Sequence, residues 1–130
     1  MPKFSLIEGD ETGHIFAPAN PVPGDHLLIV ERELLDPTTR QKVGTITAAL
    51  TFMKIIPPND ALVLGIAEHH LDDSVKHPAR AGVISVQGSF RFSDGHPAFS
   101  VVGGTGGYSN SRGTVTLDSQ EEKFNYDVTY

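Results

Sequence analysis

Glu68, His69 and His70 stand side by side, and they are a group of residues whose side chains could do chemistry. Imidazole and carboxylate groups transfer protons and bind metals. Adjacent residues of a strand point to opposite faces, so one of the two histidines at most faces inward. A metal would need further ligands such as His26 or His96, and no His-x-His spacing occurs, so we expect no metal site. Glu68 and His70 are candidates for substrate contacts at the strand end, and solvated strand-end residues are the alternative.

The stretch 101–113, VVGGTGGYSNSRG, is the second pattern that could do chemistry, because glycine-rich loops can bind phosphate. The glycines do not have the spacing of a dinucleotide fingerprint, and no Gly-Lys-Ser/Thr follows them. Residues after Arg112 alternate like a strand, whereas both phosphate motifs lead into a helix. We therefore interpret the glycines as a tight bend, a bulge or a close crossing of two backbones.

Composition excludes several other classes of function. No Gly-x-Ser-x-Gly sequence is present, so a hydrolase triad is not expected, and the absence of cysteine excludes disulfides and thiolate metal sites. The net charge is −6 and the ten Lys and Arg residues are scattered, which argues against nucleic acid as a partner. No stretch resembles a secretory signal or a membrane span, so a soluble, cytoplasmic protein without a membrane partner is expected.

The elements that must position these residues are strands. Period-two alternation and β-branched runs recur, and no long amphipathic helix is predicted. We expect one domain over 1–130 with eight strands, and 9–24 as a lid or plug loop. The predicted strands are 4–8, 26–36, 43–56, 61–71, 82–92, 98–102, 112–118 and 123–130. Their number and short connections favour an eight-stranded antiparallel up-and-down β-barrel of the calycin type, with a β-sandwich as the alternative.

The segment Ile84-Ser-Val-Gln-Gly-Ser-Phe, followed by Gly-Gly-Thr-Gly-x-Tyr and Arg112-Gly113, resembles the allene oxide cyclases and the dirigent proteins. The cyclases carry a similar Ile-Ser-Val-Gln-Gly stretch, and the dirigent proteins carry Val-Val-Gly-Gly-Thr-Gly with an Ala-Arg-Gly close. The resemblance extends from Leu34 to Leu117 and is most specific at 83–113. It implies an eight-stranded barrel, a homo-oligomer (trimer or dimer), and a lumen that binds an apolar reactive intermediate.

The resemblance also implies which residues form the site. It assigns a first-strand glutamate to Glu8 and lumenal positions to Asp10, Arg32, Leu50 and Phe90, and only Glu8 keeps the family's residue type. Alternation then turns further residues inward: Leu28, Val30, Leu34, Ile46, Ala48, Phe52, Ile84, Val86 and Phe92. Glu8 and Arg32 are the expected catalytic pair, and a salt bridge at the rim of the barrel mouth is the alternative. The expected substrate contacts are Asp10, Val30, Leu50, Phe52, Glu68, His70, Val86, Phe90, Phe92 and Tyr108, the last at the lumen edge.

These residues predict a small cyclase or isomerase that folds a hydrophobic polyketide, polyene or oxylipin-like intermediate in an apolar lumen. Glu8 and Arg32 would polarise the reacting oxygen, and this chemistry needs no cofactor. The main alternative is a non-catalytic barrel of lipocalin or dirigent type that binds or guides a hydrophobic ligand. A purely structural module, with a lumen filled by Phe52, Phe90 and Phe92, is a third.

Overall fold

The computed structural model describes residues 3–11, 13 and 15–130, and this part of the chain is built from strands without a helix. The strands are β1 (Lys3–Glu11), β2 (Ile15–Phe16), β3 (His26–Leu35), β4 (Lys42–Ile56), β5 (Asp60–Leu71), β6 (Gly82–Arg91), β7 (Ala98–Gly106), β8 (Arg112–Asp118) and β9 (Lys123–Thr129). Within the described ranges there is accordingly no helix that is long and apolar enough to cross a membrane.

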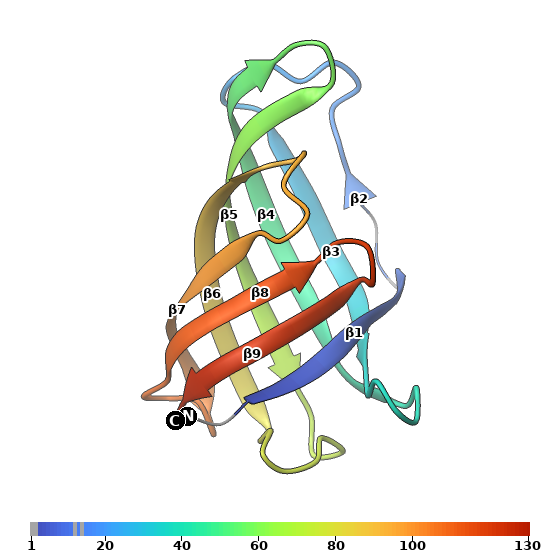
Figure 1. Ribbon diagram of the computed structural model, residues 1–130, viewed down its shortest axis with the longest axis vertical. Coiled ribbons are helices and arrows are strands. Elements are labelled where there is room, and N and C mark those ends of the chain that lie inside the picture. Colours follow the sequence, from blue (N-terminus) through green and yellow to red (C-terminus); the bar gives the residue numbers. More distant parts are fainter. Residues whose placement is uncertain (1–2, 12, 14) are drawn as a thin grey trace.

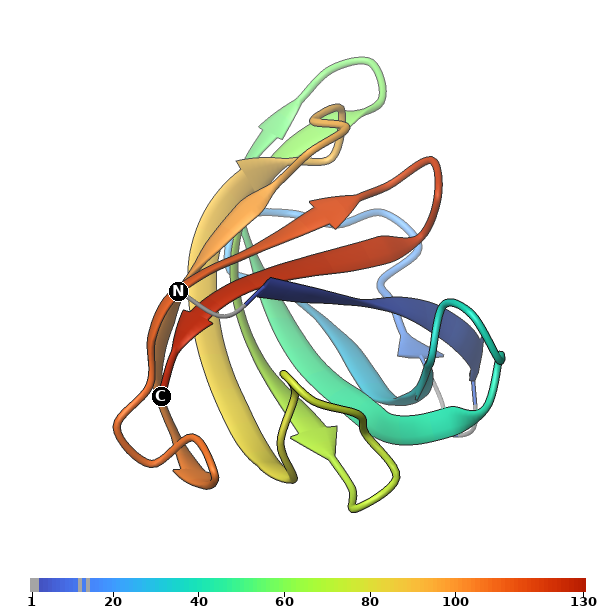
Figure 2. The same ribbon diagram turned by 60° about the horizontal axis from the view of Figure 1, so that its bottom comes forward.

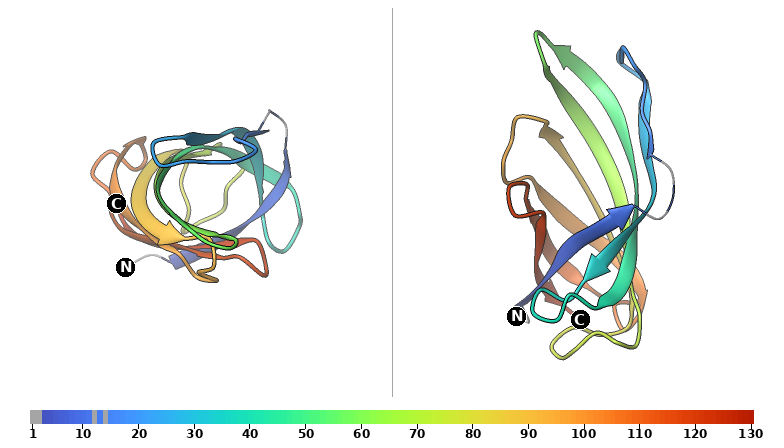
Figure 3. Two further views of the ribbon diagram at one scale, coloured as in Figure 1. Left: turned by 90° about the horizontal axis from the view of Figure 1, so that it is seen from above. Right: turned by 90° about the vertical axis from the view of Figure 1, so that its right-hand side faces the viewer.

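The strands form one antiparallel sheet in the order β1-β9-β8-β7-β6-β5-β4-β3-β2 (Figure 1). β1 also pairs with β3, and this pairing joins the two ends of the sheet into a ring. Figure 3 shows the ring from above in its left view. The fold is therefore a closed eight-stranded antiparallel barrel, as predicted, with the two-residue strand β2 as an addition on the edge of β3.

Six of the predicted strands agree with the structure to within one residue at each end, from 26–36 to 123–130, whereas two were predicted too short. β1 continues through Gly9 to Glu11, and Ile15–Phe16 pair with β3, so the predicted 9–24 loop is partly strand. Thr12 and His14 of that loop lie outside the described residues. The role of this segment as a lid or plug stays a prediction.

The glycine cluster continues β7 as a strand and leads into a turn. Gly106 has a φ of +63°, a left-handed conformation that favours glycine. A Cβ on Gly104 would lie 2.2 Å from the Val83 carbonyl oxygen, so β6 and β7 approach too closely here for a side chain. A register irregularity between Ser85 and Val86 accompanies this approach. The cluster is thus a bulged, close strand pairing.

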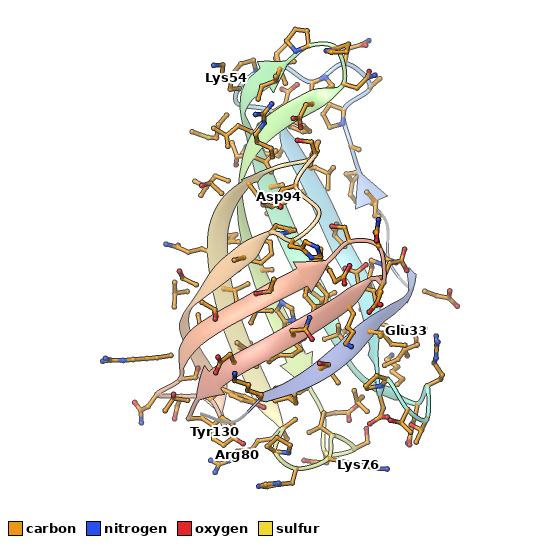
Figure 4. The ribbon with its side chains drawn as sticks, in the orientation of Figure 1. Glu33, Lys54, Lys76, Arg80, Asp94 and Tyr130 are labelled. Atoms are coloured by element: carbon orange, nitrogen blue, oxygen red, sulfur yellow. The ribbon has the colours of Figure 1, made fainter. Side chains whose placement is uncertain are left out.

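Buried side chains fill the lower part of the barrel, at the end where both termini lie (Figures 1 and 2). The main cluster contains Leu6, Leu34, Val43, Ile46, Leu71, Ile84, Val86, Tyr108, Val115, Phe124, Tyr126 and Val128. The backbone N–H of Arg80 donates a hydrogen bond to the Tyr108 hydroxyl oxygen, and the Arg80 guanidinium carbon lies 3.9 Å from the centroid of the Tyr130 ring. Figure 4 shows Arg80 and Tyr130 together at this end. The lower end is therefore closed by packed side chains.

A second, smaller cluster lies toward the opposite end and consists of Phe52, Ala61 and Val63, with Leu50 and Phe90 packed against it. The hairpin of β4 and β5 carries this cluster and extends beyond the other strands (Figures 1 and 3). Residues between the clusters on β4, β5 and β6 are small, among them Ala48, Gly65 and Gly88. The interior is thus layered from a packed floor to an aromatic upper rim.

Candidate lumenal site

The structure brings Glu8 and Arg32 together on the inner side of the barrel wall. Glu8 lies opposite the fully buried Leu34 in the pairing of β1 with β3, and Arg32 follows two residues away on the same face. The Arg32 Nη1 and Glu8 Oε2 atoms are 3.0 Å apart. The Glu8 side chain is 14% exposed and that of Arg32 is 25% exposed, so the ion pair is largely withdrawn from water.

Arg32 has a donor that this ion pair does not use. Its Nη2 group donates to the Gly9 carbonyl oxygen at 3.1 Å, whereas its Nε atom is buried and has no hydrogen-bond partner among the described residues. A buried N–H without an acceptor costs about 1–3 kcal/mol, and native proteins leave few such groups. The described residues therefore leave the Arg32 Nε–H, a buried donor, without a hydrogen-bond acceptor.

Burial raises the pKa of the Glu8 carboxyl above its ordinary value of 4.5. The positive charge of Arg32 acts in the opposite direction, and the nearby Glu122 carboxylate adds to the rise. A carboxylate in water-poor surroundings is a stronger base than an exposed one, since desolvation disfavours its charged form. Glu8 is thus suited to accept a proton.

The pair is reached from outside through a polar pocket of about 380 Å³. The pocket lies where β1, β3 and the β8–β9 turn meet, and Glu33 of its lining is labelled in Figure 4. Asp10 is exposed and belongs to this lining, so it shares a pocket with the ion pair. The lining residues are Glu8, Gly9, Asp10, Arg32, Glu33, Leu35, Arg40 and Glu122.

A second polar pair, His69 and Tyr126, lies in the interior and was not predicted from the sequence. The His69 Nδ1 atom lies 2.8 Å from the Tyr126 hydroxyl oxygen, and the two side chains are 1% and 1% exposed. The His69 ring also meets the Phe124 ring edge-on, with centroids 4.8 Å apart. Arg32 and His69 both lie opposite Ile46 of the intervening strand, so the two polar pairs occupy one level of the barrel.

Both members of this second pair are uncharged at neutral pH. Burial lowers the pKa of His69 to about 3, with a smaller contribution from the charge of His70. Burial also raises the pKa of Tyr126 well above 10.0, and the negative charge of Glu8 adds to the rise. Tyr126 therefore keeps its proton and His69 stays a neutral imidazole, so the pair provides hydrogen bonds without adding charge to the lumen.

The structure places Glu68 and His70, the two candidates for substrate contacts at the strand end, outside the lumen, as the alternative of solvated strand-end residues describes. Both side chains lie on the outer face, where His70 Nε2 and Glu68 Oε2 are 3.4 Å apart and the side chains are 43% and 55% exposed. Two inner positions of β5, Gly65 and Ala67, carry small residues, whereas the outer residue Ile66 between them is large and exposed. Among the described residues, no three His, Asp or Glu side chains are placed to hold a metal ion.

The inward orientation expected for Leu28 and Val30 is wrong. These side chains are 41% and 46% exposed on the outer face. The pairing of β3 with β4 shifts register between Ile29 and Arg32, and such a bulge exchanges the faces of the residues on its two sides. Arg32 and Leu34 are therefore lumenal, while the positions before the bulge are reversed. Tyr108 is lumenal but fully buried in the floor, so the expected open lumen edge is not found there.

The remaining predicted contacts line the interior or its rim. Phe52 is 3% exposed, and Phe92, 44% exposed at the upper end, packs edge-on against it with ring centroids 5.6 Å apart. Phe90 lies between Phe92 and Phe99, at 6.3 and 5.5 Å. Leu50 covers Gly65, and Val86 is buried in the main cluster. Contact of these residues with a substrate stays a prediction.

Comparison with known proteins identifies the fold. No family model and no curated protein sequence matches the chain. A solved structure of a pyocyanin demethylase is similar over 98% of this chain and 99% of that chain, with a TM-score of 0.74 and 22% identity. The pterocarpan synthase dirigent protein GePTS1 is similar over 97% of this chain and 81% of that chain, with a TM-score of 0.63 and 16% identity. The predicted resemblance to the allene oxide cyclase and dirigent barrels is confirmed for the fold.

Proposed function

We propose that this chain, which has the barrel fold of the allene oxide cyclases and dirigent proteins, binds a hydrophobic small molecule and isomerises or cyclises it. The observation that supports this function is the Glu8–Arg32 pair, which combines a partly buried carboxylate with an unused buried N–H donor beside a pocket. Base and donor side by side are what proton transfer next to a carbonyl group requires.

In the proposed reaction, Glu8 accepts a proton from a carbon next to a substrate carbonyl. The electrons of that C–H bond move toward the carbonyl oxygen, and the Arg32 Nε–H donates a hydrogen bond to the developing negative charge. Glu8 then returns the same proton to another carbon of the conjugated system. In the ring-closing variant, the enolate carbon instead adds to an electron-poor C=C bond of the same molecule, whose π electrons move to the neighbouring carbon, and that carbon takes the proton back from Glu8. The product is an isomer of the substrate, so the reaction consumes no oxidant and no reductant.

The aromatic residues at the upper rim favour an apolar substrate that contains unsaturated or aromatic groups. Phe52, Phe90 and Phe92 form a chain of edge-on and tilted contacts, and Phe92 is half exposed. Aromatic side chains bind flat apolar molecules through large contact areas with defined geometry. The names of the two similar structures refer to pyocyanin and to pterocarpan synthesis, and small aromatic molecules of this kind are suitable test substrates.

A barrel that binds its ligand without changing it is the second candidate function. Two observations favour it. Glu8 and Arg32 form an ion pair and so compensate each other's charge, and the floor of the barrel below them is packed with buried side chains. In this case the ion pair would orient a polar group of the ligand. Burial of apolar ligand surface in the interior would supply the affinity, and the few polar groups would fix the orientation of the ligand.

Incubation with candidate intermediates distinguishes the two functions. A panel of conjugated enones, polyenes and tricyclic aromatic molecules is mixed with the protein, and the products are analysed by chromatography coupled to mass spectrometry. An enzyme yields an isomer of unchanged mass faster than buffer does, and Glu8→Gln slows its formation. A binding protein retains the compound in native mass spectra and releases it unchanged. Absence of both results for every compound that fits the rim would contradict the proposal.

A further inference from the structure

The hydrogen bond between His69 and Tyr126 crosses the barrel and joins opposite walls. Three strands separate β5 from β9 in either direction around the ring, namely β6, β7 and β8 on one side and β4, β3 and β1 on the other. Figure 1 accordingly shows β9 at the front and β5 behind it. The 2.8 Å contact between His69 Nδ1 and the Tyr126 hydroxyl oxygen therefore connects two strands that are not paired with each other. We call this contact the cross-lumen bond.

A polar side chain buried among the core residues of the lower barrel is unusual within this chain. Among the described residues, His69 and Ser111 are the two buried polar side chains apart from tyrosines. The Ser111 hydroxyl donates to the Tyr108 carbonyl oxygen three residues earlier, so it stabilises a local turn. The hydrogen bond of His69 instead reaches a residue 57 positions away on the other side of the lumen. Apolar side chains would fill this space without the desolvation cost of an imidazole, whereas a hydrogen bond also fixes distance and direction.

The backbone next to Glu8 and Arg32 does not fix these two side chains by regular pairing. The pairing of β1 with β3 shifts register between Glu8 and Glu11, and that of β3 with β4 shifts register between Ile29 and Arg32. Such shifts leave residues unpaired and bend the strands that contain them. The two members of the ion pair therefore depend on the packing of neighbouring side chains for their separation.

On one side, the cross-lumen bond reaches the strand that carries Glu8. Tyr126 lies opposite Phe4 in the pairing of β9 with β1, and their rings stack with centroids 4.5 Å apart. Phe4 precedes Glu8 by an even number of residues and therefore lies on the same inner face of β1. Burial, the Tyr108 hydroxyl and the negative charge of Glu8, in this order, raise the pKa of Tyr126. The Glu8 carboxylate thus lies within electrostatic range of the Tyr126 hydroxyl.

On the other side, His69 is connected to Arg32 through β4. His69 lies opposite Ile46, and Ile46 lies opposite Arg32, so the three residues form one row across β5, β4 and β3. Ile46 is buried and packs within the main cluster. Neighbouring strands of a sheet keep a spacing of about 4.8 Å, so the row has a defined width. The cross-lumen bond therefore links both members of the ion pair, Glu8 through β9 and β1 and Arg32 through β4 and β3.

We propose that His69 and Tyr126 are positioning residues, whose hydrogen bond holds Glu8 and Arg32 in contact across the irregular junction of β1 and β3. Both side chains are 1% exposed, so they act through the ion pair and not by contact with a substrate. For the reaction, this inference rests on the proposed function, in which Glu8 is the base. Loss of the bond should let the two walls move apart, loosen the ion pair and misplace the base. A misplacement of about 1 Å can lower the rate of an enzyme by about 10²-fold.

Exchange of the Arg32 Nε–H with water, measured by heteronuclear NMR spectroscopy, tests the contact without any substrate. The signal is assigned by its loss in Arg32→Lys. Tyr126→Phe keeps the ring that stacks on Phe4 but removes the hydroxyl, so the ion pair should open more often and exchange should accelerate at least about 10-fold. His69→Leu should have the same effect. In His69→Asn, the amide group takes the place of Nδ1 and can bond to the Tyr126 hydroxyl, so exchange should stay within about threefold of the wild-type rate.

Val63→Ala is the matched control for a general loss of stability. Val63 is fully buried on β5, the strand of His69, but belongs to the upper cluster with Phe52. Its truncation should lower the free energy of unfolding, measured in urea, without changing the cross-lumen bond. Equal acceleration of Arg32 exchange in Val63→Ala would overturn the proposal, because the effect would then follow stability alone. An unchanged exchange rate in Tyr126→Phe would overturn it as well.

Turnover gives a second measurement for any substrate that the wild type isomerises. Tyr126→Phe should lower kcat about 10-fold and change KM less than about twofold, because the groups that bind the substrate stay in place. His69→Asn should recover most of the wild-type kcat. A Tyr126→Phe variant that binds the substrate more weakly and keeps the wild-type kcat would contradict a positioning role. If the wild type turns over no compound, the proposed function fails, and the exchange measurement still decides whether the bond positions the ion pair.

Discussion

Tyr126 places its hydroxyl oxygen 2.8 Å from Nδ1 of His69, at a level of the barrel from which water is nearly excluded. The rings of Phe4 and Tyr126 stack with centroids 4.5 Å apart, and Phe124 meets the imidazole edge-on. A neutral imidazole with a hydroxyl partner is the form in which a histidine can be buried at low cost. The pair therefore links the acid stability of the fold to the protonation of a single ring.

Acid should destabilise the protein through His69. Its pKa is about 3 in the folded state against an ordinary 6.5, so as pH falls the unfolded chain takes up the proton first. The free energy of unfolding should decrease between pH 6.5 and 3, and His69→Gln, which does not titrate, should flatten this decrease. Urea denaturation of both proteins at neutral pH and near pH 5 measures this decrease in the free energy of unfolding.

In that experiment, the pH dependence of the unfolding free energy should be compared between wild type and His69→Gln. The comparison is needed because protonation of Glu8 changes the stability in the opposite direction. The pKa of Glu8 is raised, so its contribution to stability is present at low pH and is lost as pH rises above 4.5. Asp60, whose pKa is lowered from 3.8 to about 2 chiefly by its hydrogen bond with Ser93, loses its contribution as pH falls through that range, below the pH values compared. Equal pH dependence of wild type and His69→Gln would refute the assignment to His69.

Glu8→Gln should lower turnover of an identified substrate by about 10²-fold, the size typical of a lost general base. Wild-type kcat/KM should rise with pH as Glu8 loses its proton, with an apparent pKa above 4.5, and the variant should lack this rise. Asp73→Asn, an exposed carboxylate in the loop at the lower end, is the control and should behave like wild type. A variant that keeps both full turnover and the pH rise would exclude Glu8 as the base.

Phe92→Ala should weaken the binding of a neutral apolar fluorophore such as N-phenyl-1-naphthylamine. Phe92 contributes half-exposed aromatic surface at the rim and packs on Phe52, so its loss should raise the dissociation constant roughly 10-fold with little effect on folding. Met53→Ala, on an exposed residue of the β4–β5 hairpin, is the matched truncation. Equal fluorescence titrations for the two variants would show that the rim does not bind the probe.

Gly104→Ala should destabilise the barrel by several kcal/mol. The added Cβ would lie 2.2 Å from the Val83 carbonyl oxygen and 2.7 Å from that of Tyr108, and backbone atoms cannot move aside without opening the pairing of β6 and β7. Gly95→Ala is the control, because a Cβ there meets no atom within 4 Å. Thermal unfolding of both variants measures the contrast. Similar melting temperatures would mean that the close approach relaxes easily.

Alternation of side chains predicts most of this fold but only part of its interior. It locates β6 to within one residue, because Ile84 and Val86 alternate with polar Ser85 and Gln87. It fails on β3, where a bulge before Arg32 exchanges the faces and leaves no mark in the sequence. Single-strand alternation also cannot show a contact between β5 and β9.

β5 shows the second limit of prediction from sequence. Apolar residues occupy both of its faces: Val63 and Leu71 are buried, whereas Leu64 and Ile66 are exposed, so hydropathy alone does not assign its faces. The sequence therefore shows that only one of His69 and His70 can face the lumen and does not show which. The partnership of Glu8 with Arg32 came from a family resemblance, and alternation alone would not have paired them.

The closure of the ring by β1 has a consequence for biosynthesis. The Ser5 hydroxyl on β1 donates a hydrogen bond to Asn125 Oδ1 on β9. Asn125 is translated 120 residues after Ser5, so this edge of β1 stays unpaired until nearly all of the domain has been translated. Until then the edge of β1 that β9 covers and the free edge of the last completed strand have no neighbour, and unpaired edges invite pairing with other nascent chains. Chaperone protection of the growing chain would matter most during this interval, which slow translation of the final strands would lengthen.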